Sequence, residues 1–404
     1  MSRPGRAGDY VPLQAGVETF LPKPLPPEPP IANSDEYVAA LTEAERSLGR
    51  LDAIATTLPS ADLFVYMYVR KEAVLSSQIE GTQSTLVDLL QYEAGAAPTS
   101  PEEDVAEVVN YVSALNLGLD RLEHGARVDL DLICDVHREL LRGGRGGDRR
   151  PGSFRNEQVW IGYEKCPIER ADFVPPPAGE VTRLMGDLEA FTNSGSKMPL
   201  LTRAGLLHFQ FETIHPFFDG NGRVGRMLIT LFLTRERALR RPLLYLSHHF
   251  RQRRSEYTGR LQAVRDDGDW EGWLTFFLEG VAEVSSQAAT TANLIGNLRE
   301  THRREIPRLM GGRAGKALTL LEHLFARPIV SIGEVRRVTS SSFPTANTLV
   351  DALESLGILR EITGQRHYRR FAYQPYLDIL SDGPLSAPST GPSLPMPSPS
   401  TSPH

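Results

Sequence analysis

The stretch that decides the fold is His215-Pro216-Phe217-Phe218-Asp219-Gly220-Asn221-Gly222-Arg223-Val224-Gly225-Arg226, which leads directly into the apolar run Met227-Leu228-Ile229-Thr230-Leu231-Phe232-Leu233. Two glycines flank one asparagine, so the loop can adopt positive φ and bring backbone N–H groups close to a ligand. The apolar run predicts a buried helix that begins at the loop, where free N–H groups and the helix dipole favour an anion. The stretch therefore predicts an anion site at the start of a buried helix.

The polar side chains of the same stretch suit the transfer of a phosphoryl or nucleotidyl group. Arg223 and Arg226 are three positions apart, so both project from one face of the first helical turn. Asp219 supplies a hard oxygen of the kind that binds Mg²⁺ beside phosphates. His215 has a side chain that can accept a proton near neutral pH. A base, a metal ligand, an anion site and two cations are thus gathered in one short segment.

These residues match the HxFx(D/E)GNGRxxR signature of the Fic family, which the chain resembles, without a gap or a substituted fixed position. The resemblance implies a mainly α fold, a Fic-type helical bundle with a β-hairpin flap. It also implies transfer of AMP from ATP to a Ser, Thr or Tyr hydroxyl of a target protein, with self-modification. His215 would be the base and Asp219 the Mg²⁺ ligand. The residues implied to contact ATP are Glu80, Asp219, Gly220, Asn221, Gly222, Arg223, Val224, Gly225, Arg226 and Tyr257.

A second motif lies upstream, in Ser76-Ser77-Gln78-Ile79-Glu80-Gly81, at the end of a helix expected over residues 61–80. Gly81 is a natural residue to follow a helix, and Glu80 then opposes the helix dipole and needs a cationic partner. The segment resembles the (S/T)xxxE(G/N) inhibitory motif of Fic proteins, with Ser76 at its first position. The resemblance implies that Glu80 pairs with Arg226 and occupies the space of the γ-phosphate. The alternative is a solvated glutamate at a helix end.

The pattern becomes strand-like between residues 154 and 174, where Val159, Trp160 and Ile161 combine β-branched and aromatic side chains. By the resemblance this segment is the flap, a hairpin whose edge pairs with an extended target segment near His215. Burial of Trp160 and Ile161 in the core is an equal alternative. Elsewhere, His137 falls in a helix expected over residues 129–141, and we expect it on the helix surface or in a capping role.

With 404 residues the chain has room for two or three domains. A dense proline cluster between residues 22 and 30 predicts an extended arm that builds neither helix nor sheet. Three helical patterns followed by two strand patterns after residue 316 resemble a winged helix. The expected order is a Pro-rich arm (1–34), an N-terminal helical region with the inhibitory helix (35–125), a Fic catalytic domain (126–285), a linker helix (286–315), a winged-helix domain (316–380) and a disordered tail (381–404).

Composition limits the environment and the partners. The net charge of −6 does not favour general nucleic-acid binding, although residues 301–375 hold 12 Lys and Arg against 6 Asp and Glu. The two cysteines, Cys134 and Cys166, lack metal-ligand spacing and suit a reducing compartment. There is no apolar stretch of membrane-spanning length and no signal-peptide pattern. We expect a cytoplasmic protein without a membrane partner.

Several partners and functions stay open at this stage. The sequence does not identify the target protein, and a homodimer is a hypothesis. The winged helix suggests DNA as a partner, although such domains also dock proteins. The residues expected at DNA are Thr345, Asn347 and Thr348 in the groove, and Arg366, Arg369 and Arg370 at phosphates. The alternatives to AMP transfer are a hydrolase that removes AMP, a transferase with another donor, and a DNA-binding regulator whose Fic domain senses ATP.

Overall fold

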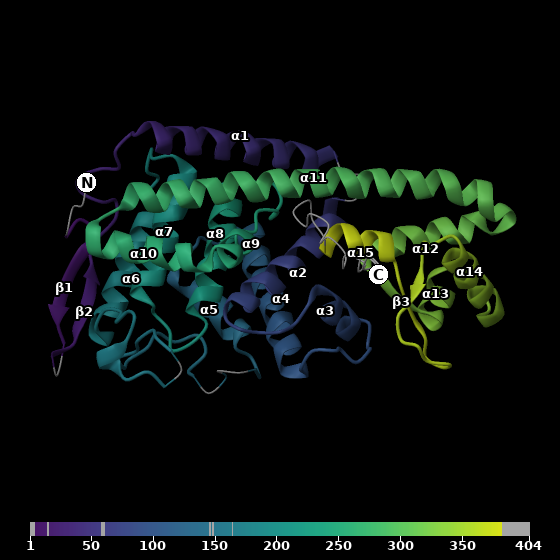
Figure 1. Ribbon diagram of the computed structural model, residues 1–404, viewed down its shortest axis with the longest axis horizontal. Coiled ribbons are helices and arrows are strands. Elements are labelled where there is room, and N and C mark those ends of the chain that lie inside the picture. The colour runs from purple at the N-terminus through teal and green to yellow at the C-terminus, as the bar shows by residue number, and fades with distance from the viewer. Residues whose placement is uncertain are drawn as a thin grey trace, which may run out of the picture.

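The computed structural model describes residues 5–13, 16–57, 61–144, 147, 149–163 and 165–381, with side chains except at 55–57, 61 and 62. The described part is mainly helical, as expected, and it also contains two small antiparallel sheets. Two long helices, α1 (Asp35–Thr57) and α11 (Trp270–Met310), lie side by side along the top of the view in Figure 1, and the other helices lie below them. None of the helices in the described ranges is long and apolar enough to cross a membrane.

The helices below this pair form the body of the molecule. They are α2 (Ala61–Ile79), α3 (Leu86–Glu93), α4 (Glu102–Glu123), α5 (Leu130–Leu140), α6 (Val181–Thr192), α7 (Leu200–Ile214), α8 (Asn221–Arg235), α9 (Ser247–Gln252) and α10 (Arg254–Asp267), with the short 3-10 turns η2 (Ile168–Arg170), η3 (Ala178–Glu180) and η4 (Gly311–Arg313). Helix α7 is buried from Leu201 to Ile214, and α8 is buried over almost its whole length. A helix that is buried on all sides lies at the centre of a bundle, so α7 and α8 form the core on which the site is built.

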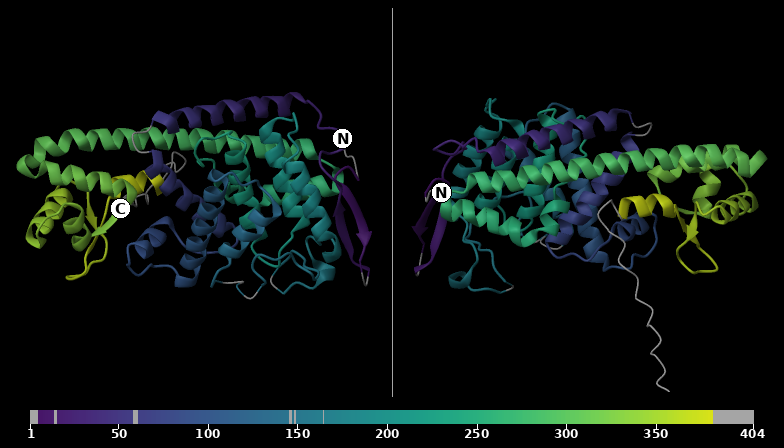
Figure 2. Two further views of the ribbon diagram at one scale, coloured as in Figure 1. Left: turned by 180° about the vertical axis from the view of Figure 1, so that it is seen from behind. Right: turned by 45° about the horizontal axis from the view of Figure 1, so that its top comes forward.

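The N-terminal arm differs from the expectation that it builds no sheet. Strands β1 (Gly8–Pro12) and β2 (Glu18–Pro22) pair as an antiparallel hairpin at one end of the molecule (Figures 1 and 2). Pro12 and Pro22 stand at the ends of the strands, where a missing N–H does not break the ladder. Phe20 is fully buried, and its amide donates to the Val174 carbonyl at 3.1 Å, which fastens the hairpin to the body.

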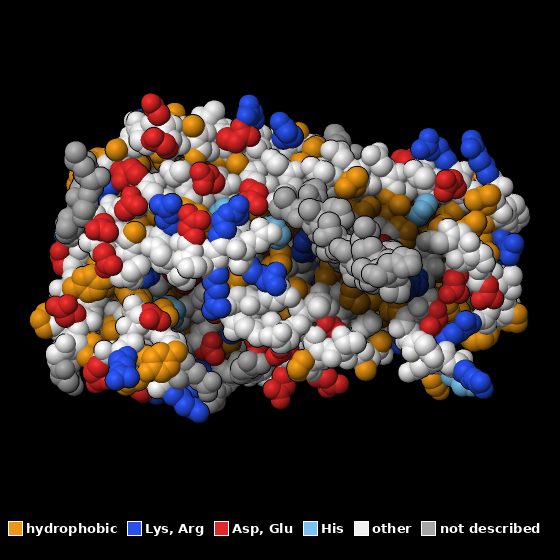
Figure 3. Space-filling view, viewed as in Figure 1, with side chains coloured by type: hydrophobic (Ala, Val, Ile, Leu, Met, Phe, Trp, Pro, Cys, Tyr) orange, Lys and Arg blue, Asp and Glu red, His pale blue; other side chains and the backbone are white. Residues whose placement is uncertain are grey.

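Helix α11 is a single helix of 41 residues, whereas we expected a core helix followed by a separate linker helix. Its first half packs along α1, and its last turns carry the buried Ile306 and Met310 toward the C-terminal elements. Because apolar positions continue on one face from the body to the C-terminal module, nothing interrupts the helix between them. On the face drawn in Figure 3, basic side chains follow the far half of α11, and elsewhere acidic and basic side chains are interspersed.

The C-terminal module comprises α12 (Ala314–Ala326), β3 (Ile329–Ser331), α13 (Ile332–Val338), α14 (Phe343–Ser355), β4 (Arg360–Glu361), β5 (Arg370–Ala372) and α15 (Gln374–Ser381). The three expected helices and the strand pair are present, and β3 joins them in an antiparallel sheet of order β3-β5-β4. The identity of this module as a winged helix, and its contact with DNA, stay predictions. Residues 382–404, nearly all of the expected disordered tail, lie outside the described residues.

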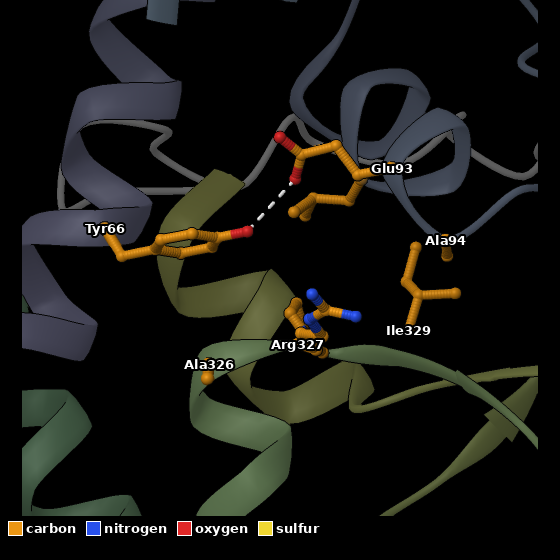
Figure 4. A pocket seen from close by; sticks show the side chains of 8 residues that line it. Tyr66, Glu93, Ala94, Ala326, Arg327 and Ile329 are labelled. Atoms are coloured by element: carbon orange, nitrogen blue, oxygen red, sulfur yellow. Dashed lines mark hydrogen bonds between the residues drawn. The ribbon is translucent and has the colours of Figure 1, made fainter. Parts of the chain in front are cut away.

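The C-terminal module abuts α2, the helix that ends next to Glu80. A small cavity of about 50 Å³ separates α2 and α3 from the end of α12 and the start of β3 (Figure 4). Beside it the Tyr66 hydroxyl donates to Glu93 at 3.3 Å, and Arg70 pairs with Glu93 at 2.8 Å while its guanidinium lies over the Tyr66 ring. Arg327 of the module lines the same cavity. Helix α2 therefore contacts the module near its middle and the candidate site at its C-terminal end.

Arg6 anchors the N-terminal arm to the body. Its buried guanidinium donates to the carbonyls of Pro29 at 2.9 Å, Pro30 at 2.8 Å and Gly268 at 3.2 Å. It also pairs with the Glu271 carboxylate at 2.7 Å. One side chain thus satisfies three carbonyls and a carboxylate from two distant parts of the chain.

Replacing Arg6→Ala should lower the free energy of unfolding by about 2 kcal/mol or more, because the carbonyls and the partly buried carboxylate lose their donor. The midpoint of urea unfolding measures the loss. Lys23→Ala is the matched control, because Lys23 pairs with Asp9 at 3.2 Å between exposed side chains and should cost less than about 1 kcal/mol. Equal shifts in the two variants would contradict the anchoring role of Arg6.

Candidate active site

The motif loop joins two buried helices through two left-handed residues. His215 follows the end of α7, has φ 50° and donates its amide to the Phe211 carbonyl at 2.9 Å. Gly220, with φ 76°, precedes α8. The Asn221 side chain accepts from the Phe217 amide and donates to the Phe217 carbonyl, both at 2.8 Å. The buried side-chain amide of Asn221 thus holds the loop in shape, and its expected contact with phosphate stays a prediction.

The glycine turn of the loop is occupied by the carboxylate of Glu80. A Cβ atom built at Gly222 would lie 2.3 Å from Glu80 Oε1 and 2.9 Å from an Arg226 nitrogen. No side chain other than hydrogen therefore fits at residue 222 in this conformation. The carboxylate lies where the helix N-terminus and the loop favour an anion.

Arg226 is held by Ser76 and Glu80 at the end of α2. Its guanidinium donates to Glu80 Oε1 at 2.7 Å, to Ser76 Oγ at 2.9 Å and to the Ser76 carbonyl at 3.0 Å. The pairing of Glu80 with Arg226 expected from the sequence is thus present, and Ser76 adds two further contacts. Burial would raise the pKa of Glu80, but the charge of Arg226 and its hydrogen bond outweigh burial and lower that pKa.

Arg223, the other arginine of the motif, contacts two acids. Arg223 pairs with Glu107 of α4 at 3.1 Å, and its other terminal nitrogen lies 3.4 Å from Asp219 Oδ1. The side chains of Arg223 and Glu107 are only 4% and 6% exposed, whereas that of Asp219 is 41% exposed. Sequence reasoning missed Glu107, because nothing in the local pattern of α4 marks it as different from its neighbours.

The imidazole of His215 is kept neutral. Burial, aided by the charge of Arg155, lowers the pKa of His215 to about 4, so the ring is free to accept a proton at neutral pH. Arg155 also fixes the backbone here, because its guanidinium donates to the carbonyls of His215 at 2.9 Å, Ile214 at 3.3 Å and Pro176 at 2.6 Å. Sequence reasoning missed Arg155, whose partners are carbonyls distant in sequence.

His137 is buried and supports the motif loop, which corrects the expectation of a surface or capping role. Its ring stacks on Phe217 at 3.7 Å between centroids. The Gly152 amide donates to Nδ1 at 2.8 Å, so the proton resides on Nε2, which donates to the Asp219 carbonyl at 3.0 Å. Burial lowers the pKa of His137 to about 4, which keeps this tautomer in place across neutral pH.

Two of the expected nucleotide contacts lie behind α8. Tyr257 is 5% exposed, stacks on Phe250 at 4.4 Å and bonds to His208 Nε2 at 2.8 Å. The other nitrogen of His208 bonds to the carbonyl of Gly225 at 3.0 Å. Val224 is fully buried. In this conformation Tyr257 and Val224 support the motif helix through the core, and their contact with nucleotide stays a prediction.

Another acidic side chain lies beneath helix α8. Glu212 of α7 is 8% exposed, and a Cβ atom added at Gly225 would lie 2.2 Å from its Oε1. Burial raises the pKa of Glu212 to about 7 against the opposing charge of Arg226. The missing side chain at Gly225 thus lets α8 pack closely on Glu212 and Phe211 of α7, and the expected contact of Gly225 with nucleotide stays a prediction.

The expected flap is not a β-hairpin. Between residues 151 and 180 the described residues form one isolated bridge, Ile161 with Phe173, and two short 3-10 turns, in place of a strand ladder. Trp160 and Ile161 are 42% and 38% exposed, which rules out the buried alternative. Prolines 175, 176 and 177 and the close packing of Gly162 on Cys166 keep the segment irregular. Docking of a target on residues 159–161 stays a prediction.

The loop fits a magnesium ion only together with a nucleotide. The described residues contain no group of three or more His, Cys, Asp or Glu that could hold a metal ion. Asp219 offers a partly exposed carboxylate beside the glycine turn. Mg²⁺ is commonly held by one or two carboxylates together with substrate phosphates and water, and this donor set fits that arrangement.

Comparison with known proteins identifies the family. Residues 38–120 match the Fic/DOC family N-terminal model, and residues 127–233 match the Fic/DOC family model. The chain contains a Fic domain. The second match includes His215, the glycine turn and both motif arginines, and the first includes Ser76, Glu80 and Glu107. The two regions thus meet at the candidate site.

Curated relatives of this Fic domain carry the name protein adenylyltransferase. The protein adenylyltransferase Fic of Drosophila ananassae is 36% identical over 105 residues, which cover 26% of this chain and 19% of that protein. That of Aedes aegypti is 30% identical over 154 residues, or 38% and 27% of the two chains. Fic-1 of Caenorhabditis briggsae is 31% identical over 123 residues, or 30% and 22%. The chain matches about a quarter of the length of these relatives.

Solved structures with Fic domains share the fold. A Fic family protein from Desulfovibrio desulfuricans aligns over 86% of this chain and 98% of its own, with a TM-score of 0.57 and 20% identity. A Fic domain containing signaling protein from Bacteroides thetaiotaomicron aligns over 63% and 97%, with a TM-score of 0.51 and 17% identity. At these identities the likeness shows the fold alone, and it confirms the expected Fic-type helical bundle.

An NMR titration of the imidazole rings tests the protonation state of His215. The ring should titrate near pH 4, because burial lowers its pKa to about 4. The His215→Asn variant assigns the signal by its loss. The exposed ring of His124 is the internal control, because a hydrogen bond to the Asp120 backbone raises its pKa. A His215 signal that titrates at or above about 6.5, the ordinary value, would contradict a neutral base held by burial.

Proposed function

We propose that the protein is an adenylyltransferase that moves AMP from ATP to a protein hydroxyl, and that Glu80 restrains it. The observation that carries the proposal is the joint occupation of the glycine turn and Arg226 by one carboxylate. An acid that fills an anion site marks the place where a substrate anion binds. The adenylyltransferase names of the curated relatives support the choice of ATP as the donor.

The residues of the motif have distinct roles in the proposed reaction. His215, neutral at physiological pH, accepts the proton of the target hydroxyl. The hydroxyl oxygen then bonds to the α-phosphorus of ATP, and the bond from that phosphorus to the bridging oxygen breaks, so pyrophosphate leaves. The Gly220 amide donates to Asp219 Oδ1 at 2.6 Å, so the amides that follow it at the start of α8 would face the phosphates, with Arg223 beside them. Mg²⁺, when bound through Asp219, would offset the charge of the phosphates.

Glu80 opposes this reaction through Arg226. With its guanidinium bonded to Glu80 and Ser76, Arg226 cannot also bind a γ-phosphate, and the carboxylate repels an anion at the turn. The Glu80 side chain is 39% exposed, so it can leave its place without unfolding the core. A charge-assisted pair of this kind is worth up to about 3 kcal/mol, so its loss should raise the rate by up to about 10²-fold.

Incorporation of label from ATP carrying ³²P in the α-phosphate tests the proposal. The Glu80→Gly variant should label itself about 10²-fold faster than wild type, because Arg226 and the turn become available. Glu80→Gln keeps the size of the side chain but removes its charge, so its rate should lie between the two. ATP labelled in the γ-phosphate should transfer nothing to any of these proteins.

The double variant Glu80→Gly with His215→Ala is the control for chemistry at this site, and it should incorporate no label above background. Label that persists in the double variant would show that His215 takes no part in the reaction. If Glu80→Gly takes no label from ATP but does from another nucleotide, the assignment of ATP as the donor is wrong. If Glu80→Gly labels no faster than wild type with any nucleotide, the restraint by Glu80 is excluded.

A further inference from the structure

The N-terminal region supplies an acid to each of the two motif arginines. Helix α2 supplies Glu80 to Arg226, and helix α4, which packs against α2, α5 and α8, supplies Glu107 to Arg223. The two acids differ in exposure, since the Glu80 side chain is 39% exposed and that of Glu107 is 6% exposed. Glu80 can exchange its partner for solvent, whereas Glu107 has no such route. The pair with Arg223 is therefore a permanent part of the site.

Arg223 lies between two carboxylates, and the balance between them decides where it points. One terminal nitrogen lies 3.1 Å from Glu107 Oε2, and the other lies 3.4 Å from Asp219 Oδ1. A buried guanidinium must be paired, because an uncompensated buried charge is strongly unfavourable. Of the two acids, Glu107 lies closer to Arg223 and is more deeply buried. The interaction between Asp219 and Arg223 stays weak as long as Glu107 neutralises the charge of Arg223.

We propose that Glu107 is a positioning residue that limits Arg223 to a long contact with one oxygen of Asp219, so that the Asp219 carboxylate stays available to a divalent cation. This inference rests on the proposed function, in which Asp219 binds Mg²⁺ beside the phosphates of ATP. Without the charge of Glu107, the guanidinium turns to the nearest remaining acid, which is Asp219. A close Arg223–Asp219 pair would then compete with the metal ion for the same oxygens.

The proposal separates metal-dependent from metal-free binding of nucleotide. Loss of the Glu107 charge weakens the metal site, because Asp219 is taken up by Arg223. The same loss adds uncompensated positive charge beside the glycine turn, which favours a bare triphosphate. A residue with a purely structural role would weaken both kinds of binding together when it is replaced. The split between the two is therefore the signature of positioning.

Equilibrium binding of a fluorescent ATP analogue tests the split in the full-length Glu80→Gly protein. The comparison is between this parent and the same protein with Glu107→Gln, which keeps the size of the side chain and removes its charge. The Mg²⁺ concentration at half-saturation should rise about tenfold or more, the usual effect of removing a residue that orients a metal ligand. In EDTA, the affinity for the analogue should be unchanged or higher.

Glu103→Gln is the matched control, because it removes the same charge from an exposed position on the same helix. Glu103→Gln should change neither the Mg²⁺ concentration at half-saturation nor the affinity for the analogue in EDTA. Asp219→Asn should by itself reproduce the loss of Mg²⁺ dependence, and Glu107→Gln should add nothing further to it. A parallel loss of binding with and without Mg²⁺ in Glu107→Gln, or no change in either, would overturn the proposal.

Thermal unfolding without nucleotide tests the same contact independently of the proposed function. If Glu107 limits the contact of Arg223 with Asp219, then Asp219→Asn should lower Tm more in the Glu107→Gln protein than in the protein with Glu107 intact. Additive shifts would mean that Arg223 never turns to Asp219, and the proposal fails even if the protein binds ATP. If instead the Tm shifts are coupled but the Glu80→Gly parent binds no nucleotide, the proposed function fails and the positioning contact stands.

Discussion

The ion pair between Arg226 and Glu80 is the contact on which the rest of the site depends. Arg226 belongs to the central helix α8, and its buried guanidinium requires a partner of opposite charge. In this conformation the partner is an acid at the end of α2, placed 146 positions away in sequence. A triphosphate would satisfy the same guanidinium equally well. In the proposed function, the Glu80 carboxylate and a phosphate of the nucleotide are therefore alternative anionic partners of Arg226.

The motif loop could bind either anion, because the side chains packed behind the loop fix its shape. Asn221 binds both polar groups of the Phe217 backbone, and the His137 ring stacks on the Phe217 side chain. Arg155 holds the carbonyls at the end of α7. Of residues 220–222, these contacts use the side chain of Asn221, whereas Gly222 lies beside the Glu80 carboxylate. The loop is therefore preorganised, and little rearrangement is needed when one anion replaces another.

The position of α2 links the site to the remainder of the chain. Its middle carries Tyr66 and Arg70, which pair with Glu93 beside the C-terminal module, and its end carries Ser76 and Glu80. One rigid helix therefore contacts the C-terminal module and the motif arginine. The N-terminal helical region is in this sense a part of the active site, since α4 also reaches it through Glu107.

The sequence by itself determined the motif loop and the start of the helix after it, because these residues are adjacent in the chain and their spacing fixes their geometry. It also placed Ser76 and Glu80 opposite Arg226 by resemblance. Only the tertiary structure decided the partners that come from elsewhere, namely Glu107, Arg155 and His137, and the burial of Tyr257. It also replaced the expected flap strands with an irregular segment and built a hairpin in the proline-rich arm. These features depend on packing between segments distant in sequence, for which no local pattern of residues carries a signal.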